Sequence, residues 1–114
     1  MKREVPELTR LEHILLSALA THERYGLEIV ETVRKAIGVS LSLGGLYTTL
    51  HRMERKQLVE SRWGETTEER EGARRRYYKA TGLGIRALAK EQGLLRRAWR
   101  MSPSGARLAF DEGV

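Results

Sequence analysis

The stretch SLGGLYTTLHRMER carries side chains suited to forming hydrogen bonds with another molecule. Its apolar residues recur at every third or fourth position, which predicts an amphipathic α-helix. On the side opposite to them lie Thr48, Arg52 and Arg55. The same side carries Gly44 and Gly45, so it has no large apolar group and can donate hydrogen bonds to nucleic-acid base edges and phosphates.

The two glycines stand where this helix should begin, although each costs about 1 kcal/mol relative to alanine in a helix interior. One interpretation is that Gly44 and Gly45 remove side chains so that backbone N–H groups can approach a phosphate. The other is that they only bend or loosen the start of the helix, as glycine can elsewhere. The residue types leave both interpretations open.

Positive charge is concentrated towards the C-terminal end. Residues 74–101 hold nine Lys/Arg and one acidic residue, whereas residues 1–73 hold eleven Lys/Arg and twelve Asp/Glu. The net charge of +6 therefore comes from one segment. Such asymmetry favours a polyanionic partner such as nucleic acid, although a solvated basic helix would have the same composition.

Other classes of function find little support. The chain has no cysteine, which excludes disulfides and thiolate metal ligands. Its three histidines lack metal-ligand spacing, and no glycine-rich phosphate loop follows a predicted strand. The longest apolar stretch, residues 14–20, is too short for a membrane span. We therefore expect a cytoplasmic protein that is not an enzyme and holds no cofactor or metal.

Hydrophobic periodicity indicates which elements position these residues. Four helices are predicted, over residues 8–19, 25–37, 42–56 and 82–101. The segment THERYG is predicted to be a break, and the strands LVESRW and RRRYYKAT form a hairpin around a polar loop. The second helix is expected to bury Leu27 and Ile29, and one of Tyr77 and Tyr78 is expected in the core. This fold class is mainly α with a small β-hairpin. Its order is that of a winged helix-turn-helix protein with an added C-terminal helix, although an unrelated α+β domain could share it.

The last predicted helix is apolar on one broad side and basic on the other. The preceding domain is too small to cover the whole apolar side, which includes Leu88, Leu95 and Trp99. Pairing with a second copy in a two-fold dimer would bury it. We therefore expect a winged helix-turn-helix domain over residues 1–81, a dimerisation helix over 82–101 and a flexible tail over 102–114.

Three stretches, RYGLEIVETV, LSLGGLYTTLHRMERKQLVESRW and RRRYYKATGLG, occur in an order that resembles the PadR family of bacterial transcriptional regulators. The resemblance implies a winged helix-turn-helix protein that binds DNA. The short C-terminal region resembles the compact subclass of this family, whose single last helix forms the dimer. Some of these proteins bind flat aromatic or cationic compounds between such helices, with tryptophan as a stacking platform. The resemblance gives that role to Trp99, for which ordinary interface packing is the alternative.

The chain also departs from the family pattern. The family often has threonine or serine where Gly45 stands, so one hydroxyl for base or phosphate contact is missing here. A glycine is common where Gln57 stands, so the turn after the recognition helix is expected to differ. Gly93 interrupts the last helix and leaves its continuity open.

We therefore expect a homodimeric, sequence-specific DNA-binding transcriptional regulator, namely a repressor that releases an inverted-repeat operator when an effector binds. A small basic RNA-binding protein and an adaptor that binds an acidic protein through the last helix are the alternatives. The residues expected to contact double-stranded DNA are Ser42, Gly44, Gly45, Tyr47, Thr48, Thr49, Arg52, Arg55, Arg74, Arg75 and Arg76. Those expected at the effector or dimer interface are Leu88, Leu95 and Trp99.

Overall fold

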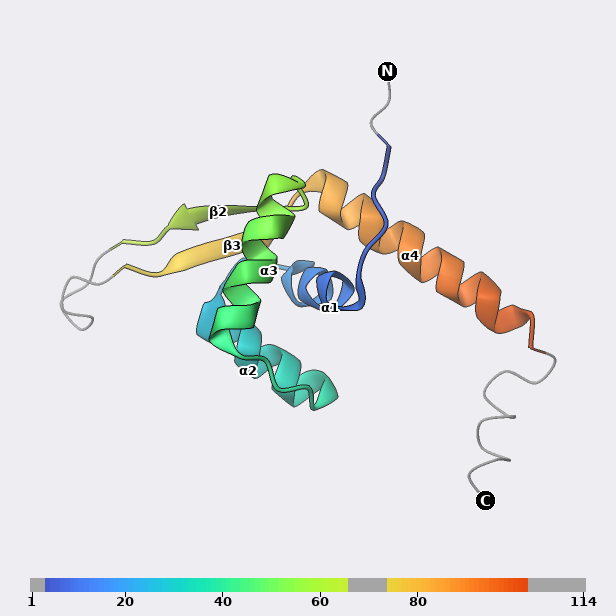
Figure 1. The fold of residues 1–114 in the computed structure, drawn as a ribbon, viewed down its shortest axis with the longest axis horizontal. Coiled ribbons are helices and arrows are strands. Elements are labelled where there is room, and N and C mark those ends of the chain that lie inside the picture. Colours follow the sequence, from blue (N-terminus) through green and yellow to red (C-terminus); the bar gives the residue numbers. More distant parts are fainter. Residues whose placement is uncertain (1–3, 66–73, 103–114) are drawn as a thin grey trace.

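The computed structural model describes residues 4–65 and 74–102. Helices and short strands follow one another along these residues, with the strands β2 and β3 on one side of the molecule and α4 extending on the other (Figure 1). The predicted helices and hairpin strands are confirmed, with ends that differ by two residues or fewer. The elements are α1 (Arg10–Leu19), β1 (Arg24–Tyr25), α2 (Gly26–Ile37), α3 (Leu43–Arg55), β2 (Val59–Trp63), β3 (Arg76–Ala80) and α4 (Gly82–Arg100).

The helix ends follow from short-range hydrogen bonds. At α1, Thr9 Oγ1 accepts a hydrogen bond from the Glu12 N–H, and Glu12 Oε1 accepts one from the Thr9 N–H at 2.8 Å. The hydroxyls of Ser42 and Thr81 cap α3 and α4 in the same way. Each such cap contributes about 0.5–2 kcal/mol. Gly38 ends α2 in the left-handed conformation, with a φ of 70°.

The sheet is antiparallel, with the strand order β1–β3–β2. Val59 lies opposite Ala80 and Trp63 lies opposite Arg76, so β2 and β3 pair along their whole length. This pairing is the predicted hairpin. The remainder of the loop between them, residues 66–73, lies outside the described residues.

Strand β1 has only two residues and adds a third strand to the hairpin. Arg24 lies opposite Tyr78, and Tyr25 lies opposite Tyr77. The prediction of a simple break at THERYG is therefore wrong at these two positions. Two residues are too few to show an alternating pattern, so the pairing depends on the connection between α1 and α2 lying beside β3.

The core lies where α1, α2, α3 and the start of α4 meet the sheet. Leu15 and Leu16 of α1 and Leu50 of α3 are fully buried. Tyr78 is also buried, at 1% exposure, which confirms the prediction that one of the two wing tyrosines is in the core. Three helices followed by this sheet, with β2 and β3 as the wing, form a winged helix-turn-helix fold.

Two leucines expected on buried helix faces are exposed. Leu27 is 59% exposed and Leu43 is 42% exposed. Each stands in the first turn of its helix, ahead of the turns that reach the core, so the helical period assigns them a face that no neighbouring element covers. The prediction that Leu27 is buried is therefore wrong.

A buried ion pair joins α1 to the end of α3. Glu12 is fully buried, and its Oε2 accepts a hydrogen bond from Lys56 Nζ at 2.8 Å. Burial by itself raises the pKa of the Glu12 carboxyl, but hydrogen bonds from Lys56 and from the Thr9 backbone outweigh it and hold this pKa below its usual value.

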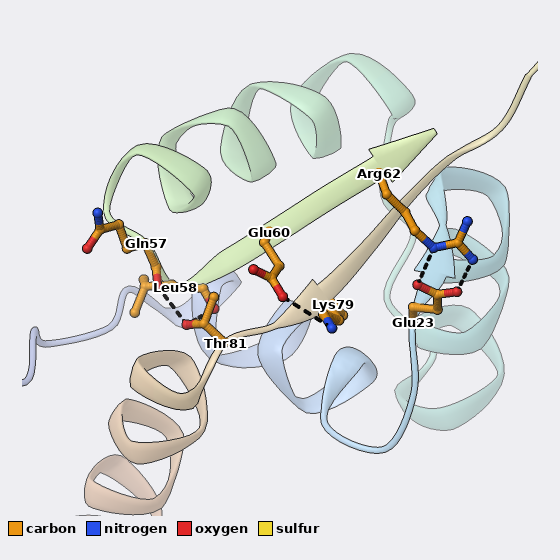
Figure 2. A network of polar contacts seen from close by, with 7 residues as sticks. All are labelled: Glu23, Gln57, Leu58, Glu60, Arg62, Lys79 and Thr81. Carbon is orange, nitrogen blue, oxygen red and sulfur yellow. Dashed lines mark hydrogen bonds and ion pairs between the residues drawn. The ribbon is translucent and has the colours of Figure 1, made fainter. Parts of the chain in front are cut away.

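The start of α4 lies directly against the turn between α3 and β2. A Cβ at Gly84 would lie 2.2 Å from the Leu58 carbonyl oxygen, so only glycine allows this approach. The Thr81 N–H donates to the same oxygen at 3.0 Å, and the Thr81 hydroxyl lies 2.6 Å from the Gln57 carbonyl oxygen (Figure 2). Gln57 has a φ of 63°, in the left-handed region where glycine is favoured.

Helix α4 is continuous through Gly93. Its first half packs into the core through Leu83 and Ala87, whereas its second half extends away from the other elements (Figure 1). Leu95 and Trp99 in that half are 53% and 55% exposed. Among the described residues, no helix combines the length and the apolar character needed to cross a membrane.

Candidate nucleic-acid interface

The outer side of α3 is the first part of the candidate interface. Thr48, Arg52 and Arg55 are exposed there. A Cβ at Gly44 would have no other atom within 4 Å, so the backbone on this side is open to an approaching molecule. The structure therefore brings these four predicted contact residues onto one accessible surface.

The two glycines differ in their surroundings. A Cβ at Gly45 would lie 3.0 Å from Ser42 Oγ, and the Gly45 N–H donates to that oxygen at 3.2 Å. Gly45 therefore makes room for the cap of α3, and its N–H is already used there. Only Gly44 has the open surroundings that the sequence-based interpretation of a close approach requires.

The two threonines of α3 also differ. Both hydroxyls donate to a backbone carbonyl one turn earlier, Thr48 to Gly44 and Thr49 to Gly45, each at 2.9 Å. Thr48 is exposed, so its oxygen can still accept a hydrogen bond from a partner. Thr49 is only 7% exposed and faces the core. The structure does not place Thr49 on the accessible side of α3.

Arg76 links the wing to α3. Its Nε and Nη2 donate to Ser61 Oγ at 3.1 and 2.9 Å, and its Nη2 lies 3.5 Å from Glu54 Oε1. Ser61 in turn donates to Glu54 Oε2 at 2.6 Å. Arg76 is therefore held inside the protein by two elements, which sets it apart from the other two arginines of the wing.

Arg74 and Arg75 come just before β3 and are held more simply. Arg74 Nε donates to the Gly64 carbonyl oxygen at 3.0 Å. The Arg75 guanidinium carbon lies 4.2 Å from the centre of the Tyr25 ring. Strand alternation predicts Arg75 on the face opposite to Arg74, but both line the same groove. The reason is that β3 begins only at Arg76, so the period of two does not apply to them.

This groove lies between α3, the start of α2 and the wing, and it has a volume of about 520 Å³. Tyr47 faces it, with its hydroxyl packed on Gly26, where a Cβ would lie 2.2 Å away. Tyr47 is thus beside the outer side of α3 rather than on it. Tyr25, Leu27, His51 and Trp63 were not among the predicted site residues; the groove is lined by Tyr25, Leu27, Tyr47, His51, Trp63, Arg74, Arg75, Arg76 and Tyr78.

The opposite side of the wing carries paired charges. Arg62 donates to both carboxylate oxygens of Glu23, and Lys79 Nζ lies 3.2 Å from Glu60 Oε1 (Figure 2). The hydrogen bond from Arg62 holds the pKa of Glu23 below its usual value. These basic side chains have acidic partners within the chain, whereas the groove on the α3 side is lined by arginines and by no carboxylate.

The residues predicted at the effector or dimer interface do not form one surface. Leu88 is 6% exposed and packs in the core of its own chain. Leu95 and Trp99 lie one turn apart on the extended half of α4 and are exposed, as is Leu94 beside them. The tertiary structure therefore removes Leu88 from the accessible apolar surface and adds Leu94.

Comparisons with known proteins agree with this geometry. Residues 15–90 match the family model described as transcriptional regulator PadR-like family. An uncharacterized protein of Lysinibacillus sphaericus is 30% identical over 76 residues, which are 65% of this chain and 67% of that protein.

Solved structures are also similar. A PadR family transcription regulator of Clostridium difficile R20291 is 30% identical, with a TM-score of 0.70 over 82% of this chain and 94% of that one. A crystal structure of Bacillus subtilis PadR in complex with operator DNA has a TM-score of 0.65 at 18% identity, over 73% of this chain and 46% of that one. The second likeness shows a shared fold.

Proposed function

The chain belongs to the PadR-like family of transcriptional regulators, and we propose that it is a cytoplasmic repressor that binds an inverted-repeat operator in double-stranded DNA as a homodimer. In this proposal, the outer side of α3 enters the major groove and the wing lies along the adjacent backbone. Base edges are read from α3, and the wing arginines contribute charge without reading sequence.

The observation that carries the proposal is the accessible side of α3 beside the arginine-lined groove. Arg52 and Arg55 are exposed, and the backbone at Gly44 is open. Arginine can donate two parallel hydrogen bonds to a guanine edge, and an exposed threonine can contact several bases. Among the wing arginines, Arg74 and Arg75 are the candidates for phosphate contacts, because Arg76 is held by Ser61 and Glu54.

The proposed dimer uses the extended half of α4. Leu94, Leu95 and Trp99 are each more than half exposed, which is unfavourable for apolar side chains in water. A two-fold axis beside α4 would bury the same three residues of both copies. We propose residues 1–81 as the DNA-binding domain and 82–101 as the dimerisation helix. The axis would set the two α3 helices about 34 Å apart, to match successive major grooves.

The proposed effector binds between the two α4 helices, with Trp99 as the platform for a flat aromatic or cationic compound. Support comes from the exposure of Trp99 on the proposed interface and from the resemblance to compact PadR proteins. A compound in that position would change the spacing of the two α3 helices and thereby weaken binding to an operator of fixed spacing.

Selection of bound duplexes from a random DNA library tests this proposal. The selected sequences should form an inverted repeat whose half-site centres are about one helical turn apart. Arg52→Ala should then weaken binding to the selected duplex by about 1–3 kcal/mol and relax the preference at one position of each half-site. Affinity measured by fluorescence anisotropy, on the selected and on a scrambled duplex at several salt concentrations, gives both quantities.

Arg34→Ala is the matched control, because Arg34 is an exposed helical arginine whose neighbour is Glu31 on α2. It should leave the preference for the selected duplex unchanged. Equal losses on selected and scrambled DNA for Arg52→Ala would instead mean that Arg52 contacts only phosphates. Selection that returns no common sequence, or stronger binding to structured RNA, would contradict the proposed function.

A further inference from the structure

The groove between α3, the start of α2 and the wing has an unusual lining. Three of its nine lining residues are arginines and four are aromatic, and none is acidic. Its volume of about 520 Å³ lies within the range of small-molecule sites, which is about 300–1,000 Å³. Both the charge and the ring surfaces call for a ligand that is anionic and flat.

One wall of the groove is held in place by contacts within the protein. The guanidinium carbon of Arg76 lies 5.2 Å from the centre of the Trp63 ring, and its nitrogens are bonded to Ser61. Trp63 is nevertheless 53% exposed. The wing therefore presents a large ring that is supported from behind by a cation and open to the groove.

The opposite wall comes from the two helices. Tyr47 is 40% exposed, and its hydroxyl end is packed on Gly26, which restricts the position of its ring. His51 follows one turn later on the same side of α3. Preorganised aromatic walls of this kind bind flat molecules without a large loss of side-chain entropy.

Arg74 and Arg75 supply the charge at this site. Each guanidinium has five N–H donors, and its planar fork matches a carboxylate. Arg74 uses its Nε on the Gly64 carbonyl, and Arg75 lies over Tyr25, a position that leaves the edge of the guanidinium for in-plane hydrogen bonds.

We propose that this groove binds a flat aromatic carboxylate, with its ring between Tyr47 and Trp63 and its carboxylate at Arg74 and Arg75. The DNA backbone is the other anion near this surface. A phosphodiester would satisfy the arginines but would not account for two half-exposed ring faces, so the aromatic acid fits the lining better. Because the groove adjoins the proposed DNA-binding side of α3, a bound acid would compete with DNA. This competition rests on the proposed function, whereas binding of the acid does not.

Isothermal titration calorimetry of the full chain with 2-naphthoate tests the binding directly. We expect saturable binding of 2-naphthoate, and affinity at least tenfold weaker for the neutral analogue 2-naphthalenemethanol. Arg75→Gln and Trp63→Leu should each weaken the binding of 2-naphthoate at least tenfold. Arg97→Gln is the matched control on α4, far from the groove, and should bind like the unchanged protein. Circular dichroism checks that each variant remains folded, and Arg74→Gln replaces Arg75→Gln if that variant unfolds.

Two results would overturn the inference. One is binding of 2-naphthoate that Arg75→Gln and Trp63→Leu leave unchanged. The other is binding that Trp99→Leu abolishes while Trp63→Leu retains it, which would assign the acid to α4. For the competition, saturating 2-naphthoate should raise the Kd for the selected duplex at least tenfold in the unchanged protein and not in Trp63→Leu. If the chain binds no DNA, the proposed function fails, but the calorimetry still decides whether the groove holds the acid.

Discussion

At the scale of single residues, Glu12 is a charge that folding removes from water. Its carboxylate is fully buried and is satisfied by Lys56 Nζ and the Thr9 N–H. Removal of one partner from a buried pair leaves the other charge without compensation, and this usually costs far more than the pair contributes. Here the lysine side chain is 39% exposed, so water can replace part of what it supplies.

We predict that Lys56→Met lowers the free energy of unfolding at pH 7 by about 2 kcal/mol. Because the pKa of Glu12 is lowered in the folded protein, the stabilisation that it provides is present above the pKa of an unfolded glutamate, about 4.3, and is lost as the pH falls through the lower folded value. The difference between Lys56→Met and the unchanged protein should therefore shrink between pH 5 and pH 3, as measured by urea unfolding at each pH.

Lys35→Met is the control for this prediction, because Lys35 makes an exposed i,i+4 pair with Glu31 on α2. It should change the free energy of unfolding by less than about 0.5 kcal/mol. A loss in Lys56→Met that stays equal at every pH would show that the lysine acts through the packing of its methylene groups and not through its charge.

At the scale of elements, the angle between α3 and the wing depends on two structures. One is the cluster of Arg76, Ser61 and Glu54, which joins β3, β2 and α3. The other is the turn at Gln57, whose carbonyl oxygen meets the Thr81 hydroxyl at the start of α4. Both hold the surface that we assign to DNA, and the turn does so with a residue in an unfavourable conformation.

We predict that Gln57→Gly raises the free energy of unfolding by about 0.5–1 kcal/mol. The left-handed φ of 63° costs a residue with a Cβ more than it costs glycine, and part of this gain is offset by the greater freedom of glycine in the unfolded chain. Urea midpoints at constant pH provide the measurement.

Two variants control this prediction. Gln57→Ala keeps the Cβ and should give no gain. Gln92→Gly places the same change inside α4 and should lower the free energy of unfolding by about 1 kcal/mol. Equal stability of Gln57→Gly and Gln57→Ala would mean that the turn is not strained.

At the scale of the whole molecule, the extended half of α4 determines the proposed assembly. We predict that the double variant Leu95→Glu/Trp99→Glu is a monomer in sedimentation equilibrium. Two charges at a symmetric apolar contact appear four times in a dimer, and burial of unpaired charges is strongly unfavourable. Because both side chains are more than half exposed within one chain, the far-UV circular dichroism should remain unchanged.

Arg97→Glu is the matched control for the assembly, since it introduces a charge of the same sign on the basic side of the same helix. It should remain dimeric. A double variant that still sediments as a dimer would exclude this half of α4 as the interface. Truncation after Thr81 would be a poorer test, because it removes Leu83, Ala87 and Leu88 from the core.

The sequence by itself determined the four helices, the wing hairpin, the capping of α4 by Thr81 and the presence of one wing tyrosine in the core. These features depend on residues close together along the chain, where periods of 3.6 and 2 and the preferences of cap residues act. The accessible side of α3 with Arg52 and Arg55 follows from the same period.

Only the tertiary structure decided which residues share a surface across elements. It buried Thr49 and Leu88, exposed Leu27, and held Arg76 inside the protein while Arg75 came to lie over Tyr25. It also created β1 and the groove that brings Trp63 of the wing near Tyr47 of α3. Such contacts join residues distant in sequence, and their geometry depends on how helices and sheet pack, which no local period encodes.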